Sequence, residues 1–261
     1  MEKIMKLIRA CIIAFSMYSK IPMPQIEWEK DSMKYVMCFF PWVGAVIGGC
    51  FYLWGIWGRR FLTGSQLYAV LLTVIPVLLT GGIHLDGFLD TTDAISSWQS
   101  RERRLEILKD SHTGAFAVIG ACVYFLLYFG LASELEPEKI PVAALGFFLS
   151  RCLSGYAVAS FPCARESGLA AMFANAADKK CVKKVLFCQA IIFSAWIMRL
   201  DMLAGGALIL VSLLVFLWYY RMSMDKFGGI TGDLAGWFLQ VCELLQLAAV
   251  VFAGKFQLYY Y

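Results

Sequence analysis

The sequence is poor in charge. Only 16% of its 261 residues are Asp, Glu, Lys or Arg, whereas 60% are hydrophobic. Soluble domains carry roughly 25% charged residues, so this composition excludes an ordinary soluble protein. The formal net charge of +4 is too small to indicate a nucleic-acid partner. No Cys-x-x-Cys pair occurs among the nine cysteines, which gives no sign of a zinc site or a disulfide framework.

The sequence also lacks internal repeats and low-complexity linkers, so we expect one integral-membrane catalytic domain over residues 1–261. The first 20 residues contain a short apolar stretch flanked by Lys3, Lys6 and Arg9, but no small-residue cleavage site follows it. This pattern favours an N-terminal amphipathic helix over a cleaved signal peptide.

Long apolar runs are abundant. A helix needs about 20 apolar residues to cross the hydrocarbon core of a membrane. The runs that approach this length cover residues 36–58, 61–83, 114–132, 140–163, 185–198, 202–220 and 227–253. We therefore predict an all-α polytopic transmembrane bundle with about seven spans.

The basic residues indicate the orientation. Loops facing the cytoplasm are enriched in Lys and Arg, and basic residues gather in segments 101–109 and 165–184. The acidic turn 134–138 then falls on the opposite side of the membrane. Arg59 and Arg60 fall there too, as an exception to the rule. We expect a multi-pass protein of the cell (inner) membrane, in contact with lipid and with its polar loops in the cytoplasm. The protein is also a candidate for homo-oligomer formation.

Three aspartates, Asp86, Asp90 and Asp93, follow the second apolar run. Their spacing of four and then three residues places the carboxylates on one face of a helix, where like charges repel. A hard cation such as Mg²⁺ relieves this repulsion, because it takes carboxylate oxygens while keeping sites for water and phosphate. The alternative is a solvated helix start, at which acidic side chains complement the helix dipole.

Two further segments carry polar groups at the ends of apolar runs. Arg103, Arg104 and Lys109 are suited to phosphate oxygens, although positive-inside topology alone also explains them. Gly232 and Asp233 lie in a glycine-rich stretch, where backbone N–H groups can approach an anion and a carboxylate can complete a metal shell. The other interpretation is a helix start capped by Thr231 or Asp233.

Arg151 interrupts an apolar run, where a lone charge costs about 2.5–3.5 kcal/mol on insertion scales. It therefore requires a partner. The candidates are Glu243, an aspartate of the first cluster and a substrate phosphate, and the pair can be structural or functional. The two histidines, His84 and His112, are interpreted as hydrogen-bonding or spectator residues.

At these positions the sequence resembles the cobalamin synthases, also called adenosylcobinamide-GDP ribazoletransferases. The matching motifs run through nearly the whole chain and are, in order, Lys20–Pro24, Phe40–Gly44, Gly81–Gly87, Asp90, Asp93, the stretch from Arg103-Arg104 to Asp110-Ser111, Gly114–Phe116, Arg151, Pro162–Leu169 and Gly229–Asp233. One departure is Ser96-Ser97-Trp98, where the family resemblance leads us to expect a more glycine-rich turn.

The resemblance implies an Mg²⁺-dependent membrane enzyme that joins adenosylcobinamide-GDP to α-ribazole or its 5′-phosphate and releases GMP. It suggests that Asp86 and Asp90 hold the metal, with Asp93 or Asp233 completing the shell or accepting a proton. The remaining residues would bind substrate, and these are Arg103, Arg104, Lys109, Arg151 and Gly232.

Two other functions compete with this interpretation. A CDP-alcohol phosphotransferase also uses clustered aspartates and Mg²⁺, and the pair Asp86-Gly87 invites the comparison, but the rest of its motif is absent. An ion-coupled transporter would use Asp233, Glu243 and Arg151 as an ion pathway. Against it, the densest acids lie at a loop boundary rather than at the middle of a span.

Overall fold

The computed structural model describes residues 2–62 and 65–260, and its regular elements are helices. In chain order they are α1 (Glu2–Tyr18), α2 (Lys30–Met33), α3 (Val36–Phe61), α4 (Ser65–Thr80), α5 (Ile83–Ser96), α6 (Arg101–Ile107), α7 (Ala115–Glu134), η1 (Pro137–Lys139), α8 (Ile140–Ser160), α9 (Leu169–Ala176), α10 (Lys179–Leu200), α11 (Met202–Phe227) and α12 (Gly232–Tyr260). The predicted all-α class is confirmed.

Within the described residues, six helices are long and apolar enough to cross a membrane, and a bent pair raises the number to seven. This agrees with the prediction of about seven spans. The run over 61–83 was predicted to be one span, and the bent pair corrects this prediction. Residues 63–64 of that run lie outside the described residues. Helix α4 ends at Thr80 and α5 leaves at 96°, because Gly81 and Gly82 adopt φ values of 67° and 81° that glycine tolerates best.

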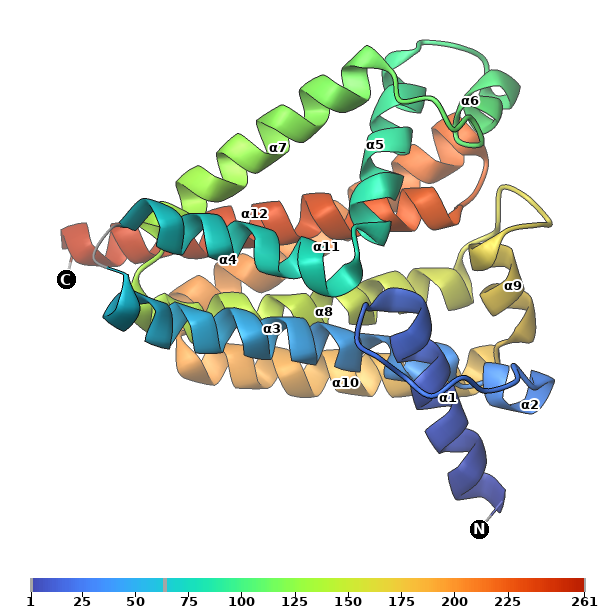
Figure 1. Ribbon diagram of the computed structural model, residues 1–261, viewed down its shortest axis with the longest axis horizontal. Coiled ribbons are helices and arrows are strands. Elements are labelled where there is room, and N and C mark those ends of the chain that lie inside the picture. The colour runs from blue at the N-terminus through green and yellow to red at the C-terminus, as the bar shows by residue number, and fades with distance from the viewer. Residues whose placement is uncertain (1, 63–64, 261) are drawn as a thin grey trace.

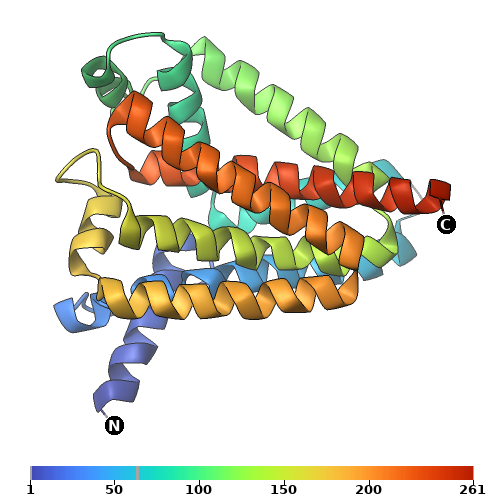
Figure 2. The same cartoon turned by 180° about the vertical axis from the view of Figure 1, so that it is seen from behind.

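The long helices run along one axis of the molecule (Figures 1 and 2). Helices α3, α8 and α10 lie side by side, α11 and α12 pack next to them, and α7 crosses obliquely on the outside. Helix α1 lies across this axis at one end, with Ile4, Met5 and Ile8 exposed. This position and these apolar side chains fit the predicted N-terminal amphipathic helix.

The connections sort into two groups at opposite ends. Segments 97–114, 161–168 and 228–231 gather at one end, and η1 lies at the other (Figure 1). Arg59 lies at the η1 end and donates a hydrogen bond of 2.9 Å to the carbonyl of Leu135. The two basic loops therefore share an end, opposite the acidic turn, as the sequence predicted.

The polar loop 97–100 contains an unusual residue. Trp98 has a φ of 53°, the only positive value found at a non-glycine among the described residues. This is the position at which the family resemblance anticipated a glycine-rich turn. Trp98 thus adopts a left-handed conformation that its side chain disfavours.

Helix α8 is the most enclosed span and packs against α3 through two glycines one turn apart, Gly44 and Gly48. A Cβ atom at either position would collide with the α8 backbone, at the carbonyl oxygen of Phe147 or Ala144. Small residues at this spacing let two helices approach closely in a membrane, where lipid supplies no hydrophobic drive for association. Helices α3 and α8 therefore form the rigid centre of the bundle.

We expect Gly48→Ala to lower the free energy of unfolding by about 1–3 kcal/mol, because the added methyl group forces α3 away from α8. Gly49→Ala is the matched control, since a Cβ at Gly49 meets no atom within 4 Å. Thermal unfolding in detergent measures both variants. Equal effects at the two neighbouring glycines would contradict the close crossing.

Candidate active site

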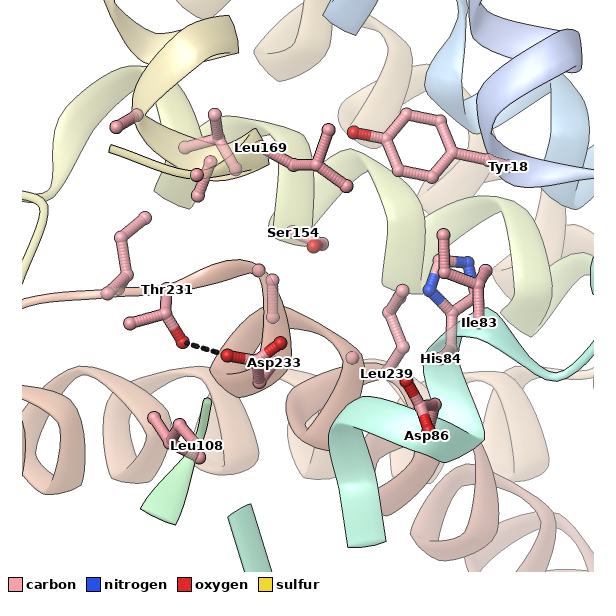
Figure 3. A pocket seen from close by; sticks show the side chains of 18 of the residues that line it. Tyr18, Ile83, His84, Asp86, Leu108, Ser154, Leu169, Thr231, Asp233 and Leu239 are labelled. Atoms are coloured by element: carbon pink, nitrogen blue, oxygen red, sulfur yellow. Dashed lines mark hydrogen bonds between the residues drawn. The ribbon is translucent and has the colours of Figure 1, made fainter. Parts of the chain in front are cut away.

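A cavity of about 430 Å³ opens at the end of the bundle that carries the basic loops. Its walls come from α1, α3, α5, α8, α9, the residue that follows α6, the loop between α8 and α9, and the start of α12. Figure 3 shows Tyr18 and His84 on one side, Thr231 and Asp233 on the other, and Asp86 below. The cavity therefore joins segments that are far apart in the sequence.

The crossing of α5 and α12 brings the first two acids to this cavity. A Cβ on Gly87 would lie 2.7 Å from the carbonyl oxygen of Asp233, and one on Gly236 would lie 2.9 Å from that of His84. Only glycine permits this approach without displacing one backbone. Asp86 and Asp233 consequently line the same cavity from two different helices.

Two loops are joined beside the start of α12. The backbone N–H of Ile230 donates to the carbonyl of Pro162, and that of Ala164 donates to the carbonyl of Ile230, both at 2.9 Å. This short parallel bridge holds the α8–α9 loop against the α11–α12 loop. It places Arg165 at the cavity wall near Asp233.

Arg165 supplies the cation that lines the cavity among the described residues. Its guanidinium donates a hydrogen bond to the carbonyl of Leu105. Burial lowers the pKa of Arg165, while the nearby carboxylate of Asp233 acts in the opposite direction. Even a lowered arginine pKa leaves the group charged near neutral pH, so the cavity wall contains one fixed positive charge near Asp233.

Helix α12 begins with a side-chain cap. The hydroxyl of Thr231 accepts a hydrogen bond of 3.2 Å from the N–H of Leu234, and it donates one of 3.3 Å to the carboxylate of Asp233. Gly232, between them, also lines the cavity. The capping role suggested for Thr231 is confirmed, and the cap holds the Asp233 carboxylate toward the cavity (Figure 3).

The three predicted aspartates of α5 have different environments. Asp86 is exposed to the cavity, and Asp90 is half-buried one turn later, close enough to Asp86, Asp93 and Asp233 for their carboxylates to repel it. Asp93 instead accepts a hydrogen bond of 3.0 Å from the N–H of Ala117 in the first turn of α7. No three metal-ligating side chains converge within the described residues.

The predicted basic residues lie outside the cavity wall. Arg103 is exposed and forms a 2.7 Å ion pair with Glu106, Arg104 is half-buried, and Lys109 is exposed. Arg165, by contrast, was not among the predicted site residues. Its place at the cavity depends on the bridge between two loops separated by about 65 residues, so the local basic segment and the Pro162–Leu169 motif do not reveal it.

Arg151 is enclosed in the bundle and forms a 2.6 Å ion pair with Glu243. It also donates to the carbonyl of Phe147 at 2.9 Å, and Ser150 donates to Glu243 at 3.0 Å. One of the three partners considered for Arg151 is therefore confirmed. The pair links α8 to α12 behind the cavity, and Arg151 is not part of the cavity wall.

Two cavity residues were not among the predicted site residues. Tyr18, at the end of α1, lines the cavity, and burial raises the pKa of its hydroxyl so that it stays a hydrogen-bond donor. His84 is buried, and its Nε2 atom has no hydrogen-bond partner. The Gly81–Gly87 motif contains His84, but the sequence does not show that its ring meets α1.

Comparison with known proteins places these features in a family. The profile of the cobalamin-5-phosphate synthases matches residues 10–251. The chain is 49% identical over 249 residues to an adenosylcobinamide-GDP ribazoletransferase of Lachnoclostridium phytofermentans, with 95% of both chains covered. Proteins of that name from Clostridium botulinum (strain Alaska E43) and Desulfitobacterium hafniense are each 34% identical, over 92% and 95% of this chain and 96% of theirs. No solved structure matches.

We expect Glu243→Leu to lower the free energy of unfolding by about 3–5 kcal/mol, because it leaves the Arg151 guanidinium as an unpaired charge inside the bundle. The double variant Arg151→Met/Glu243→Leu removes that charge and should recover most of the loss. Thermal unfolding in detergent measures both.

The control is Glu106→Gln, which breaks the exposed pair with Arg103 and should change the free energy of unfolding by about 0–1 kcal/mol. If the double variant is as unstable as Glu243→Leu, Arg151 does more than balance Glu243.

Proposed function

We propose, from the premise that the chain belongs to the cobalamin-5-phosphate synthase family, that it joins adenosylcobinamide-GDP to α-ribazole or its 5′-phosphate and releases GMP. Family membership makes it an enzyme, a transferase of cobalamin synthesis, and thereby displaces the CDP-alcohol phosphotransferase and transporter alternatives. The observation that carries the proposal is the meeting of Asp86, Asp233 and Arg165 at one cavity.

The reaction is a displacement at phosphorus. A ribose hydroxyl oxygen of the ribazole forms a bond to the phosphorus that bears the cobinamide group, and the bond from that phosphorus to the GMP oxygen breaks. The hydroxyl proton is released, and GMP leaves as an anion. Such a step depends on alignment of the two substrates and on neutralisation of the phosphate charge rather than on covalent chemistry by the protein.

The carboxylates support a role for Mg²⁺. This ion usually binds through one or two protein carboxylates together with water and substrate phosphates. Asp86 and Asp233 face one cavity, and Asp90 stands close enough to be repelled by both. This donor set fits an ion that is completed by a diphosphate, and it explains why three acids need not converge. When bound, Mg²⁺ would neutralise phosphate charge and leave the carboxylates without mutual repulsion.

Arg165 and the start of α12 are the groups we assign to the phosphates. A guanidinium binds phosphate oxygens through paired N–H groups. The N-terminal end of a long helix adds free N–H groups and the positive end of its dipole, and Gly232 allows an anion to approach them. In this assignment, Arg165 takes the phosphate-binding role that was predicted for Arg103, Arg104 and Lys109.

We further propose that residues 1–261 act as one catalytic domain in the cell membrane, with the cavity on the cytoplasmic side. The described helices support a multi-pass membrane protein. The end with the cavity also carries most basic residues of the connecting segments, which favours the cytoplasm under the positive-inside rule. Bulky charged substrates would then reach the site from water.

We expect Asp86→Asn and Asp233→Asn each to lower kcat about 100-fold or more, because each removes a charge that holds the cation and the diphosphate. The assay is GMP release from adenosylcobinamide-GDP and α-ribazole 5′-phosphate over a Mg²⁺ titration. Asp110→Asn is the control, since Asp110 is exposed outside the cavity and pairs with His112. An Asp86→Asn enzyme that stays fully active at every Mg²⁺ concentration would show that Asp86 holds no metal.

We expect Arg165→Gln to lower kcat/KM for adenosylcobinamide-GDP about 10–100-fold, which corresponds to the loss of a charge-assisted hydrogen bond to phosphate. Arg103→Gln should change it less than about threefold, because Arg103 is exposed and already paired with Glu106. Steady-state kinetics at saturating acceptor compare the two. If Arg103→Gln lowered kcat/KM more than Arg165→Gln, the phosphate-binding role would belong to α6 instead.

A further inference from the structure

The cavity has two chemically different halves. Thr231 and Asp233 lie on one side of it, Asp86 lies below, and Arg165 also lines it; these are the groups assigned above to phosphate and cation (Figure 3). Tyr18, Ile83 and His84 lie on the other side (Figure 3), and the remaining apolar lining includes Met37 and Phe40 of α3, Val158 of α8 and Leu239 of α12. A ligand that fills both halves must itself have one charged end and one flat or apolar end.

The apolar half is built around three aromatic rings. Tyr18 and Phe40 have ring centroids 4.4 Å apart, and the rings of Tyr18 and His84 are nearly parallel, with an interplanar angle of 21° and a centroid separation of 6.0 Å. Phe40 also meets His84 edge-on at 5.9 Å. Tyr18 is half-buried and reaches into the cavity from the end of α1 (Figure 3).

His84 brings an unsatisfied polar atom to this aromatic wall. The residue is 4% exposed, and its Nε2 atom has no hydrogen-bond partner although it is enclosed. Buried polar atoms are normally paired, because leaving one unpaired forfeits its hydration. An enclosed, orphaned ring nitrogen at a cavity wall therefore indicates a partner atom on a ligand.

We propose that the aromatic half of the cavity holds the benzimidazole base of the ribazole acceptor, with the base against the ring of Tyr18 and its unsubstituted ring nitrogen accepting a hydrogen bond from His84 Nε2. This assignment rests on the proposed function and specifies which substrate enters the cavity. A fused aromatic base with two methyl groups and one free nitrogen matches a wall of aromatic rings with one free donor.

The other two parts of the substrates fit this half poorly. Guanine carries several donors and acceptors around its edge, and an apolar wall would leave most of them unpaired. A corrin macrocycle with its amide side chains exceeds a cavity of about 430 Å³, because pockets of 300–1,000 Å³ typically enclose ligands of drug size. The corrinoid therefore remains at the mouth of the cavity, on the side where Asp86 is exposed.

The position of His84 on α5 connects base recognition to chemistry. His84 and Asp86 are two residues apart on the same helix, and both line the cavity. A base held at His84 places its attached ribose toward the carboxylates of Asp86 and Asp233. The acceptor hydroxyl then lies in the half of the cavity to which the diphosphate binds, as the displacement requires.

The test separates the two substrates kinetically. We expect Tyr18→Leu, which keeps bulk but loses the aromatic face, to raise KM for α-ribazole 5′-phosphate about tenfold, with KM for adenosylcobinamide-GDP within about twofold of the parent value. Tyr18→Phe should stay near the parent enzyme for both substrates. Tyr52→Leu is the matched control, because Tyr52 is an exposed tyrosine of α3 outside the cavity wall.

A second measurement probes His84 directly. The parent enzyme should bind benzimidazole riboside about tenfold more tightly than indole riboside, in which a C–H group replaces the free nitrogen, and His84→Ala should abolish this preference. Equilibrium titration in the absence of the GDP-linked donor measures the affinities for both ribosides and needs no turnover.

The outcomes are distinct for the proposed function and for this inference. If the parent enzyme releases no GMP, the proposed function fails. If it is active but Tyr18→Leu raises KM for the GDP-linked donor instead, or if His84→Ala keeps the preference for benzimidazole, the base lies elsewhere and the inference is overturned.

Discussion

The close crossing of α5 and α12 is the constraint on which the site depends. Gly87 lies against the backbone of Asp233, and Gly236 lies against that of His84, so each helix uses a glycine to admit the other. This contact sets Asp86 and Asp233 at one cavity although almost 150 residues separate them. It also concentrates negative charge, because Asp90 lies within the influence of both. The geometry therefore brings carboxylates close enough to repel one another, and a cation that also binds a diphosphate would reduce this repulsion.

The rest of the bundle holds this crossing in place. Helix α8 packs on α3 through small residues and is tied to α12 by the ion pair of Arg151 and Glu243. In a hydrocarbon environment a single charge of either sign would be costly, so separating α8 from α12 would leave one unpaired charge on each helix. On the polar side, the bridge between Pro162 and Ile230 joins the α8–α9 loop to the α11–α12 loop. The cavity thus has a buried anchor behind it and a short backbone bridge at its rim.

Much of the fold could be predicted from the sequence, because apolar runs of about 20 residues leave few alternatives to membrane-spanning helices. The sequence also drew attention to Asp86 and Asp233, which line the cavity, since carboxylates at a span boundary are conspicuous. The break after Thr80 was missed because hydropathy does not report a change of direction, which depends here on two left-handed glycines. Arg165 and His84 were missed as site residues for a related reason. Each acquires its role from a segment distant in the chain, and helix periodicity contains no information about such contacts.

The break between α4 and α5 has a consequence for how the protein is made. The N–H of Lys20 donates a 2.7 Å hydrogen bond to the carbonyl of Leu79, and the side chain of Lys20 covers Gly81. The first helix thus completes its docking against a part of the chain that the ribosome delivers some 60 residues later. Helix α1 can already pack on α3 by then, but the segment that follows its C-terminal end has no partner at the break until α4 has been made. The order of synthesis therefore fixes the two ends of this contact at different times.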